Sequence, residues 1–131
     1  MDDVLDANLL LRFFLNDDPN KAKAVEKLLK TKRNISIPLI VISEVIWTLL
    51  SLYKQPKREV IEKIQSLLAL SNVSFEKKDT IHFALEIFTR FNIDWIDAYI
   101  AASVQRGEFT KIYSYDHDFD KIPGVKRLEP K

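Results

Sequence analysis

The stretch Val4-Leu5-Asp6-Ala7-Asn8 decides which fold the sequence predicts. It is a short apolar run that ends in a carboxylate and an amide, and a mostly apolar run follows from Leu9 to Leu15. We expect Asp6 to lie between a buried strand and a helix. A buried carboxylate is costly unless it is paired, hydrogen-bonded or metal-bound, and ligands of open α/β sheets bind beyond the carboxyl ends of the strands. Asp6 is therefore either a ligand-facing acid or the N-cap of the next helix.

Length and composition predict one domain over residues 1–131, long enough for a proper core. The chain has no Cys, which excludes disulfides, thiolate metal sites and cysteine catalysis. It has 2 Gly and no GxGxxG or GxxxxGK[ST] motif, which argues against a glycine-rich phosphate loop. A net charge of +1 gives no overall basic signal for nucleic acid. Because we find no signal peptide and no membrane-length apolar run, we expect a cytoplasmic protein without membrane contact.

Strand-like and helix-like segments alternate along the chain. The predicted strands lie at residues 4–6, 34–37, 73–75, 111–114 and 125–128. Four predicted helices span residues 8–15, 39–53, 78–91 and 94–106. Two more begin at residues 19 and 57, and their apolar stripes end at residues 29 and 68. This alternation predicts an α/β fold with a parallel sheet, right-handed crossovers and helices on both faces.

Several acids occupy apolar surroundings, as Asp6 does. Glu44 has Ile40, Val41 and Trp47 as helix neighbours, so we expect it to face a cleft or a partner. The alternative is a buried Glu paired with one Arg or Lys.

Asp94 and Asp97 stand three residues apart around a helix start, which places them on neighbouring sites of the first turn. Asp94 is expected to be the N-cap, whereas Asp97 precedes a helix rich in small residues.

Asp116 follows an apolar strand at the position where a ligand-facing group is expected. Asx turns are the alternative, more for Asp118 and Asp120 than for Asp116. If such acids converge, two carboxylates about 5 Å apart repel by about 3 kcal/mol at an effective dielectric constant near 20. Oxygen ligands suit Mg²⁺ or Mn²⁺, and such a site without a nucleotide loop indicates hydrolysis of a phosphate ester.

Four segments, in this order, resemble the motifs of PIN-domain ribonucleases, specifically VapC-type toxins. They are residues 4–12 with 16–19, residues 43–49, residues 94–98 and residues 113–119. The resemblance spans nearly the whole chain. It implies a three-layer α/β/α sandwich with a short central parallel sheet.

The resemblance also implies a function: a Mg²⁺- or Mn²⁺-dependent endoribonuclease, the toxin of a type II toxin–antitoxin system. It further implies a homodimer and inhibition by a small antitoxin that covers the site. The acidic roles fall on Asp6, Glu44, Asp97 and Asp116, with Asp6, Asp97 and Asp116 as metal ligands and Glu44 acting on the attacking water. Auxiliary positions are Asn8, Asp94, Ser114 and Asp118.

Two residues depart from the family pattern. Ala7 replaces the usual Thr or Ser, and Ser114 replaces the usual Thr, which affects helper hydrogen bonds rather than the acids. Arg12, one turn after Asn8, is either a phosphate contact or part of a surface ion pair.

Two other functions stay open. A Mg²⁺-dependent phosphatase or phospho-acceptor domain also gathers acids at strand ends, although the aspartyl-phosphate pattern requires Asp where this chain has Asn8. A non-catalytic PIN-like binding module would keep the acids without cleaving RNA.

Overall fold

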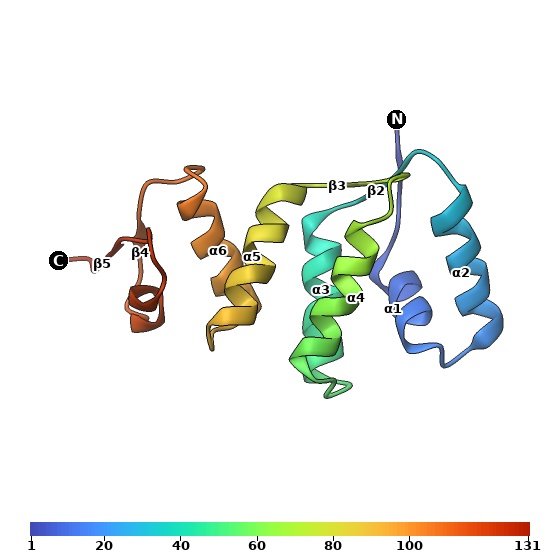
Figure 1. Cartoon of the computed structure of the whole chain (residues 1–131), viewed down its shortest axis with the longest axis horizontal. Coiled ribbons are helices and arrows are strands. Elements are labelled where there is room, and N and C mark those ends of the chain that lie inside the picture. The colour runs from blue at the N-terminus through green and yellow to red at the C-terminus, as the bar shows by residue number, and fades with distance from the viewer. The chain divides into compact units, whose positions relative to one another are not determined.

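The computed structural model describes all 131 residues, and the chain falls into two compact units, residues 1–78 and 79–131 (Figure 1). Each unit is described by itself. Strands and helices alternate as predicted, and every strand pairing is parallel, so the expected α/β class is confirmed. No helix has the length and apolar character required to cross a membrane.

Unit 1 contains a three-stranded parallel sheet in the order β1 (Asp3–Val4), β2 (Ile35–Ile37) and β3 (Val73–Phe75). Ile35 pairs with Asp3 on one side and with Val73 on the other. The carboxyl ends of the three strands therefore share one edge. The prediction that Asp6 follows a buried strand is wrong, because β1 is a two-residue edge strand of this sheet and Val4 is 65% exposed.

Four helices complete unit 1 (Figure 1, blue to green). They are α1 (Ala7–Leu15), α2 (Pro19–Thr31), α3 (Leu39–Ser51) and α4 (Lys57–Leu68). Asn16 at φ +51° ends α1 in the left-handed region. Asp18 then caps α2 by accepting a hydrogen bond from the Lys21 N–H at 3.2 Å, with Pro19 in the first turn as predicted.

The core of unit 1 follows the apolar stripes that the sequence predicts. On α2 the stripe is buried at Ala22, Val25 and Leu29, and half-buried at Leu28. On α4 it is buried at Val60, Ile64, Leu67 and Leu68. Burial of such side chains supplies the main favourable term in folding. Helices α1 and α3, which position Asp6 and Glu44, bury Leu10 and Ile46 in the same way.

Unit 2 begins with α5 (Lys78–Arg90, whose first residue belongs to unit 1) and continues with α6 (Trp95–Gln105). The ring of Trp95 meets Phe88 edge-on, with 5.9 Å between the ring centroids. Close packing is possible because Ala98, Ala101 and Ala102 of α6 are fully buried, as this small-residue helix predicts. Gly107 at φ +78° follows the helix end at the expected position.

The C-terminal part of unit 2 pairs β4 (Ile112–Tyr113) with β5 (Arg127–Leu128) in parallel. Ile112 lies opposite Arg127. Parallel strands need a long connection, and here residues 114–126 provide it with the short 3₁₀ helix η1 (His117–Lys121). The predicted acidic turn after the fourth strand is therefore part of this connection.

Candidate functional site

Asp6 caps helix α1, so the N-cap interpretation of this residue is confirmed. Its Oδ1 atom accepts a hydrogen bond from the Asn8 N–H at 2.5 Å. The side chain is exposed, and the structure gives its second carboxylate oxygen no hydrogen-bond partner. One carboxylate can thus cap the helix through one oxygen and present the other to a ligand.

Glu44 lies on α3, is exposed, and makes no hydrogen bond or ion pair. This excludes the alternative of a buried Glu with an Arg or Lys partner. Its apolar helix neighbours are exposed as well, Ile40 at 76% and Trp47 at 59%. Glu44 therefore stands beside exposed apolar side chains of unit 1, and its carboxylate is open to solvent.

The N-terminus of α3 is capped by a residue that sequence inspection missed. Pro38 precedes the helix and has no side chain that can cap it. Instead the Leu39 N–H donates to Glu76 Oε1 at 2.9 Å, from the position after β3. This long-range contact ties α3, and with it Glu44, to the carboxyl edge of the sheet. Sequence spacing gives no signal for it, because the two residues are 37 positions apart.

Arg12 forms an ion pair with Asp17, with 2.9 Å between Nη1 and Oδ2, which confirms the ion-pair interpretation. Its Nε atom is buried without a hydrogen-bond partner. Arg12 also lines a cavity of about 540 Å³ between α1 and α2 together with Asn8, Leu9, Lys21, Ala24 and Val25. The phosphate-contact interpretation stays a prediction.

Asp97 lies in the first turn of α6 and is half-buried. Burial raises the pKa of its carboxyl above the ordinary value, and the negative charges of Asp116, Asp94 and Asp118 raise this pKa further. The negative charges of three acids of unit 2 therefore reach Asp97. Asp94 occupies the predicted N-cap position, but its side chain makes no capping hydrogen bond.

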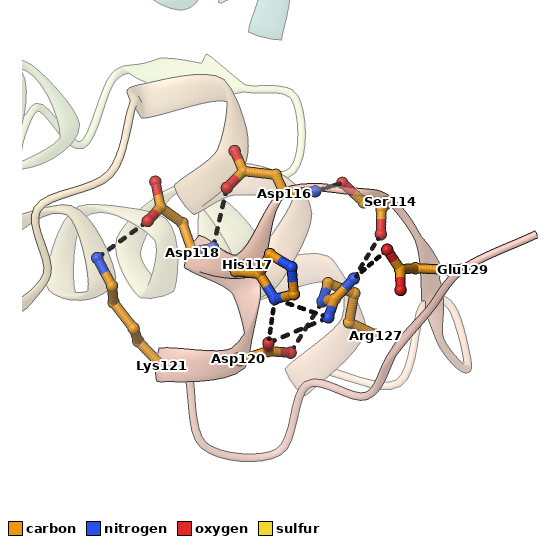
Figure 2. Close-up of polar contacts among 8 residues, drawn as sticks. All are labelled: Ser114, Asp116, His117, Asp118, Asp120, Lys121, Arg127 and Glu129. Atoms are coloured by element: carbon orange, nitrogen blue, oxygen red, sulfur yellow. Dashed lines mark hydrogen bonds and ion pairs between the residues drawn. The ribbon is translucent and has the colours of Figure 1, made fainter.

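Asp116 begins the 3₁₀ helix η1 after strand β4 (Figure 2). Its Oδ1 atom accepts from the Asp118 N–H at 2.9 Å, and its own N–H donates to Ser114 Oγ at 3.0 Å. Ser114 thus holds the backbone of Asp116, and its role as a polar helper of the site stays a prediction. Asp118 pairs with Lys121 at 3.0 Å, so part of its charge is already compensated.

The same turn contains a network around Arg127, which sequence inspection also missed. Arg127 donates through Nε to Asp120 Oδ1 at 2.9 Å and through Nη1 to the Ser114 carbonyl at 2.9 Å (Figure 2). His117 Nδ1 lies 3.0 Å from Arg127 Nη2 and 3.2 Å from Asp120 Oδ2. Hydrogen bonds from Arg127 and then from His117 hold the pKa of Asp120 below its ordinary value.

The predicted site residues thus divide between the units. Asp6 with Asn8 and, separately, Glu44 belong to unit 1, while Asp94, Asp97, Asp116 and Asp118 belong to unit 2 and interact there. No three acidic or histidine side chains are grouped as metal ligands. The unit 2 acids offer carboxylate oxygens, the donors that hard cations prefer, and a cation would offset the negative charges that add to burial in raising the pKa of Asp97.

A family model described as PIN domain matches residues 4–125, which include parts of both units. No curated protein matches the chain.

Two solved structures are similar over most of their length. One is the crystal structure of VapBC2 from Rickettsia felis bound to a DNA fragment from their promoter, with 18% identity, 98% of each chain covered and a TM-score of 0.40. The other is a toxin–antitoxin complex from Klebsiella pneumoniae, with 21% identity, 93% of each chain covered and a TM-score of 0.34.

Proposed function

The chain belongs to the PIN domain family, and on that premise we propose that it is a divalent-metal-dependent endoribonuclease, the toxin of a type II toxin–antitoxin pair. The observation that carries the proposal is that Asp97 lies half-buried in the first turn of α6, where burial and then the negative charges of Asp116, Asp94 and Asp118 raise the pKa of its carboxyl. Such repulsion serves no stabilising purpose in a metal-free protein, whereas it prepares a site for a cation.

The site residues have separate roles in this proposal. Asp6, Asp97 and Asp116 would hold Mg²⁺ or Mn²⁺, and residues 1–131 are proposed to be one domain. When bound, the cation supplies Lewis acidity toward phosphoryl oxygens and lowers the pKa of water. Asp94 and Asp118 are auxiliary acids, and Asn8 and Ser114 are polar helpers.

Glu44 is proposed as the group that orients and deprotonates the attacking water, because its carboxylate has no competing partner. The water oxygen forms a bond to phosphorus, and the bond from phosphorus to the 3′ oxygen breaks. The departing oxygen takes up a proton. The products carry a 5′-phosphate and a 3′-hydroxyl.

The proposed partners follow from the same motifs. RNA is the substrate, with Arg12 contacting a phosphate beside the α1–α2 cavity. A small antitoxin protein is the inhibitor, and the active form is a cytoplasmic homodimer. The motif resemblance along the chain supports these partners, and each is testable with the purified protein.

The test is cleavage of a structured RNA with Mn²⁺ or Mg²⁺ and with a chelator. We expect cleavage that needs the metal and leaves 5′-phosphate ends. D97N should lower the rate at least about 100-fold, beyond the usual 10–100-fold cost of losing an outer-shell partner. The matched control is D79N, an exposed Asp on α5 of the same unit, which should cleave like the parent.

Three results would contradict the proposal. Cleavage that persists in the chelator excludes metal dependence. RNA that stays intact while Mn²⁺ raises the melting temperature indicates a binding module. Release of phosphate from a small monoester, with RNA left intact, indicates a phosphatase.

A further inference from the structure

We infer that Arg127 is a positioning residue that holds the turn carrying Asp116 and Asp118 in place for the metal site. The inference rests on the proposed function for its purpose, but its geometry stands on the contacts of unit 2. Arg127 lies on β5, and parallel pairing with β4 brings it beside the segment that leaves β4.

One guanidinium holds both ends of this turn. Nη1 donates to the Ser114 carbonyl at 2.9 Å, at the start of the turn. Nε and Nη2 donate to the two carboxylate oxygens of Asp120, which lies in η1, at 2.9 and 3.2 Å. Asp116 and Asp118 lie between these two anchors (Figure 2). A bidentate contact of this kind fixes the orientation of the Asp120 carboxylate as well as its distance from the guanidinium.

The anchored residues in turn hold Asp116. Ser114 Oγ accepts from the Asp116 N–H at 3.0 Å, and Asp116 Oδ1 accepts from the Asp118 N–H at 2.9 Å. Fixing the backbone of Ser114 and the side chain of Asp120 therefore restricts Asp116 from both sides. The Arg127 side chain is only 10% exposed, although it lies on a two-residue strand.

Lysine cannot replace this arrangement, because an ammonium group lacks the planar fork that reaches a carbonyl and a carboxylate together. R127K keeps the charge and most of the side-chain volume. It is the variant that separates positioning from folding.

The first measurement is amide exchange by NMR on the metal-free protein, comparing the parent, R127K and D120N. R127K should speed exchange of the Asp116 and Asp118 amides about fivefold or more, while buried α5 and α6 amides keep their rates. D120N keeps the Ser114 contact and should speed the Asp118 amide more than the Asp116 amide. R106K is the matched control, because the contacts of Arg106 are with Asp79 and the Phe83 ring.

The second measurement is titration with Mn²⁺, followed by paramagnetic broadening of the Asp97 amide. The Mn²⁺ concentration for half-broadening should rise 10–100-fold in R127K, the usual cost of losing an outer-shell partner, and stay unchanged in R106K.

Parent-like exchange at Asp116 and Asp118 in R127K would overturn the inference. Uniform loosening of the whole unit with an unchanged Mn²⁺ midpoint would also overturn it, since Arg127 would then be structural only. If Mn²⁺ leaves the parent spectrum unchanged, the proposed function fails, while the exchange data still decide the role of Arg127.

Discussion

The pKa of Asp97 links the charge of the candidate site to the stability of the protein. Burial and the neighbouring carboxylates of Asp116, Asp94 and Asp118 raise its pKa in the folded chain above the ordinary value of 3.8. The folded protein therefore binds this proton more tightly than the unfolded chain does. The resulting contribution to stability is complete below pH 3.8 and is lost as the pH rises through the folded pKa.

The D97N variant does not lose stability in this way as the pH rises, because Asn stays neutral at every pH. With a chelator present, D97N should be more stable than the parent at pH 7, and the difference should shrink to zero as the pH falls below 3.8. Urea unfolding of the parent and of D97N, from pH 7 to below pH 3.8, measures this difference in stability. A D97N protein that is less stable than the parent by the same amount at every pH would contradict the assignment of repulsion at this site.

At the residue scale, the candidates that the sequence predicts are acids in apolar surroundings. Asp97 and Asp116 are two of them, and the negative charge of Asp116 adds to burial in raising the pKa of Asp97, while their roles at a metal site stay predictions. Glu44 was chosen on the same ground, but its apolar neighbours Ile40 and Trp47 turn out to be exposed. Arg127 was missed because its importance depends on strand register, and a two-residue strand carries no register signal.

At the scale of elements, the capping of α1 separates the two roles of Asp6. Asn caps helices about as well as Asp, whereas Ala does not. D6A should therefore lower the free energy of unfolding by about 1 kcal/mol, while D6N should leave it nearly unchanged. Both should lose metal-dependent cleavage, because both lack the carboxylate.

The control for this prediction is Asp18, which caps α2 through a similar hydrogen bond to Lys21 N–H. D18A should lose a similar amount of stability, and neither D18A nor D18N should change cleavage. Thermal or urea unfolding, together with the RNA assay, measures all four variants. A D6N protein that cleaves like the parent would show that Asp6 is a cap and nothing more.

Element boundaries were predictable where proline and glycine mark them. Pro19 and Pro38 lie at the starts of α2 and α3, and Gly107 follows the end of α6, as the sequence indicated. Strand β1 is shorter than predicted, since Leu5 already leads into the cap at Asp6. The Glu76 cap of α3 could not be predicted, because it depends on strands β2 and β3 lying side by side.

At the scale of the whole molecule, the chain is a PIN domain protein, and the family model covers residues 4–125. The expected PIN-like α/β fold is thereby confirmed. Within each unit, the buried apolar stripes and the helix starts at proline follow from local sequence patterns, whereas the Glu76 cap and the Arg127 contacts depend on strand pairing. The proposed four-acid site needs contacts beyond a single unit, because Asp6 and Glu44 belong to unit 1 and Asp97 and Asp116 to unit 2. It is supported by the order of the motifs along the sequence.

One measurement tests this claim most directly: titration of the isotope-labelled full chain with Mn²⁺, following paramagnetic broadening at every backbone amide. We predict that amides next to Asp6 in unit 1 and next to Asp97 and Asp116 in unit 2 broaden together, with one midpoint, and that D97N shifts that midpoint for both units. Broadening confined to one unit, or two independent midpoints, would contradict a single four-acid site.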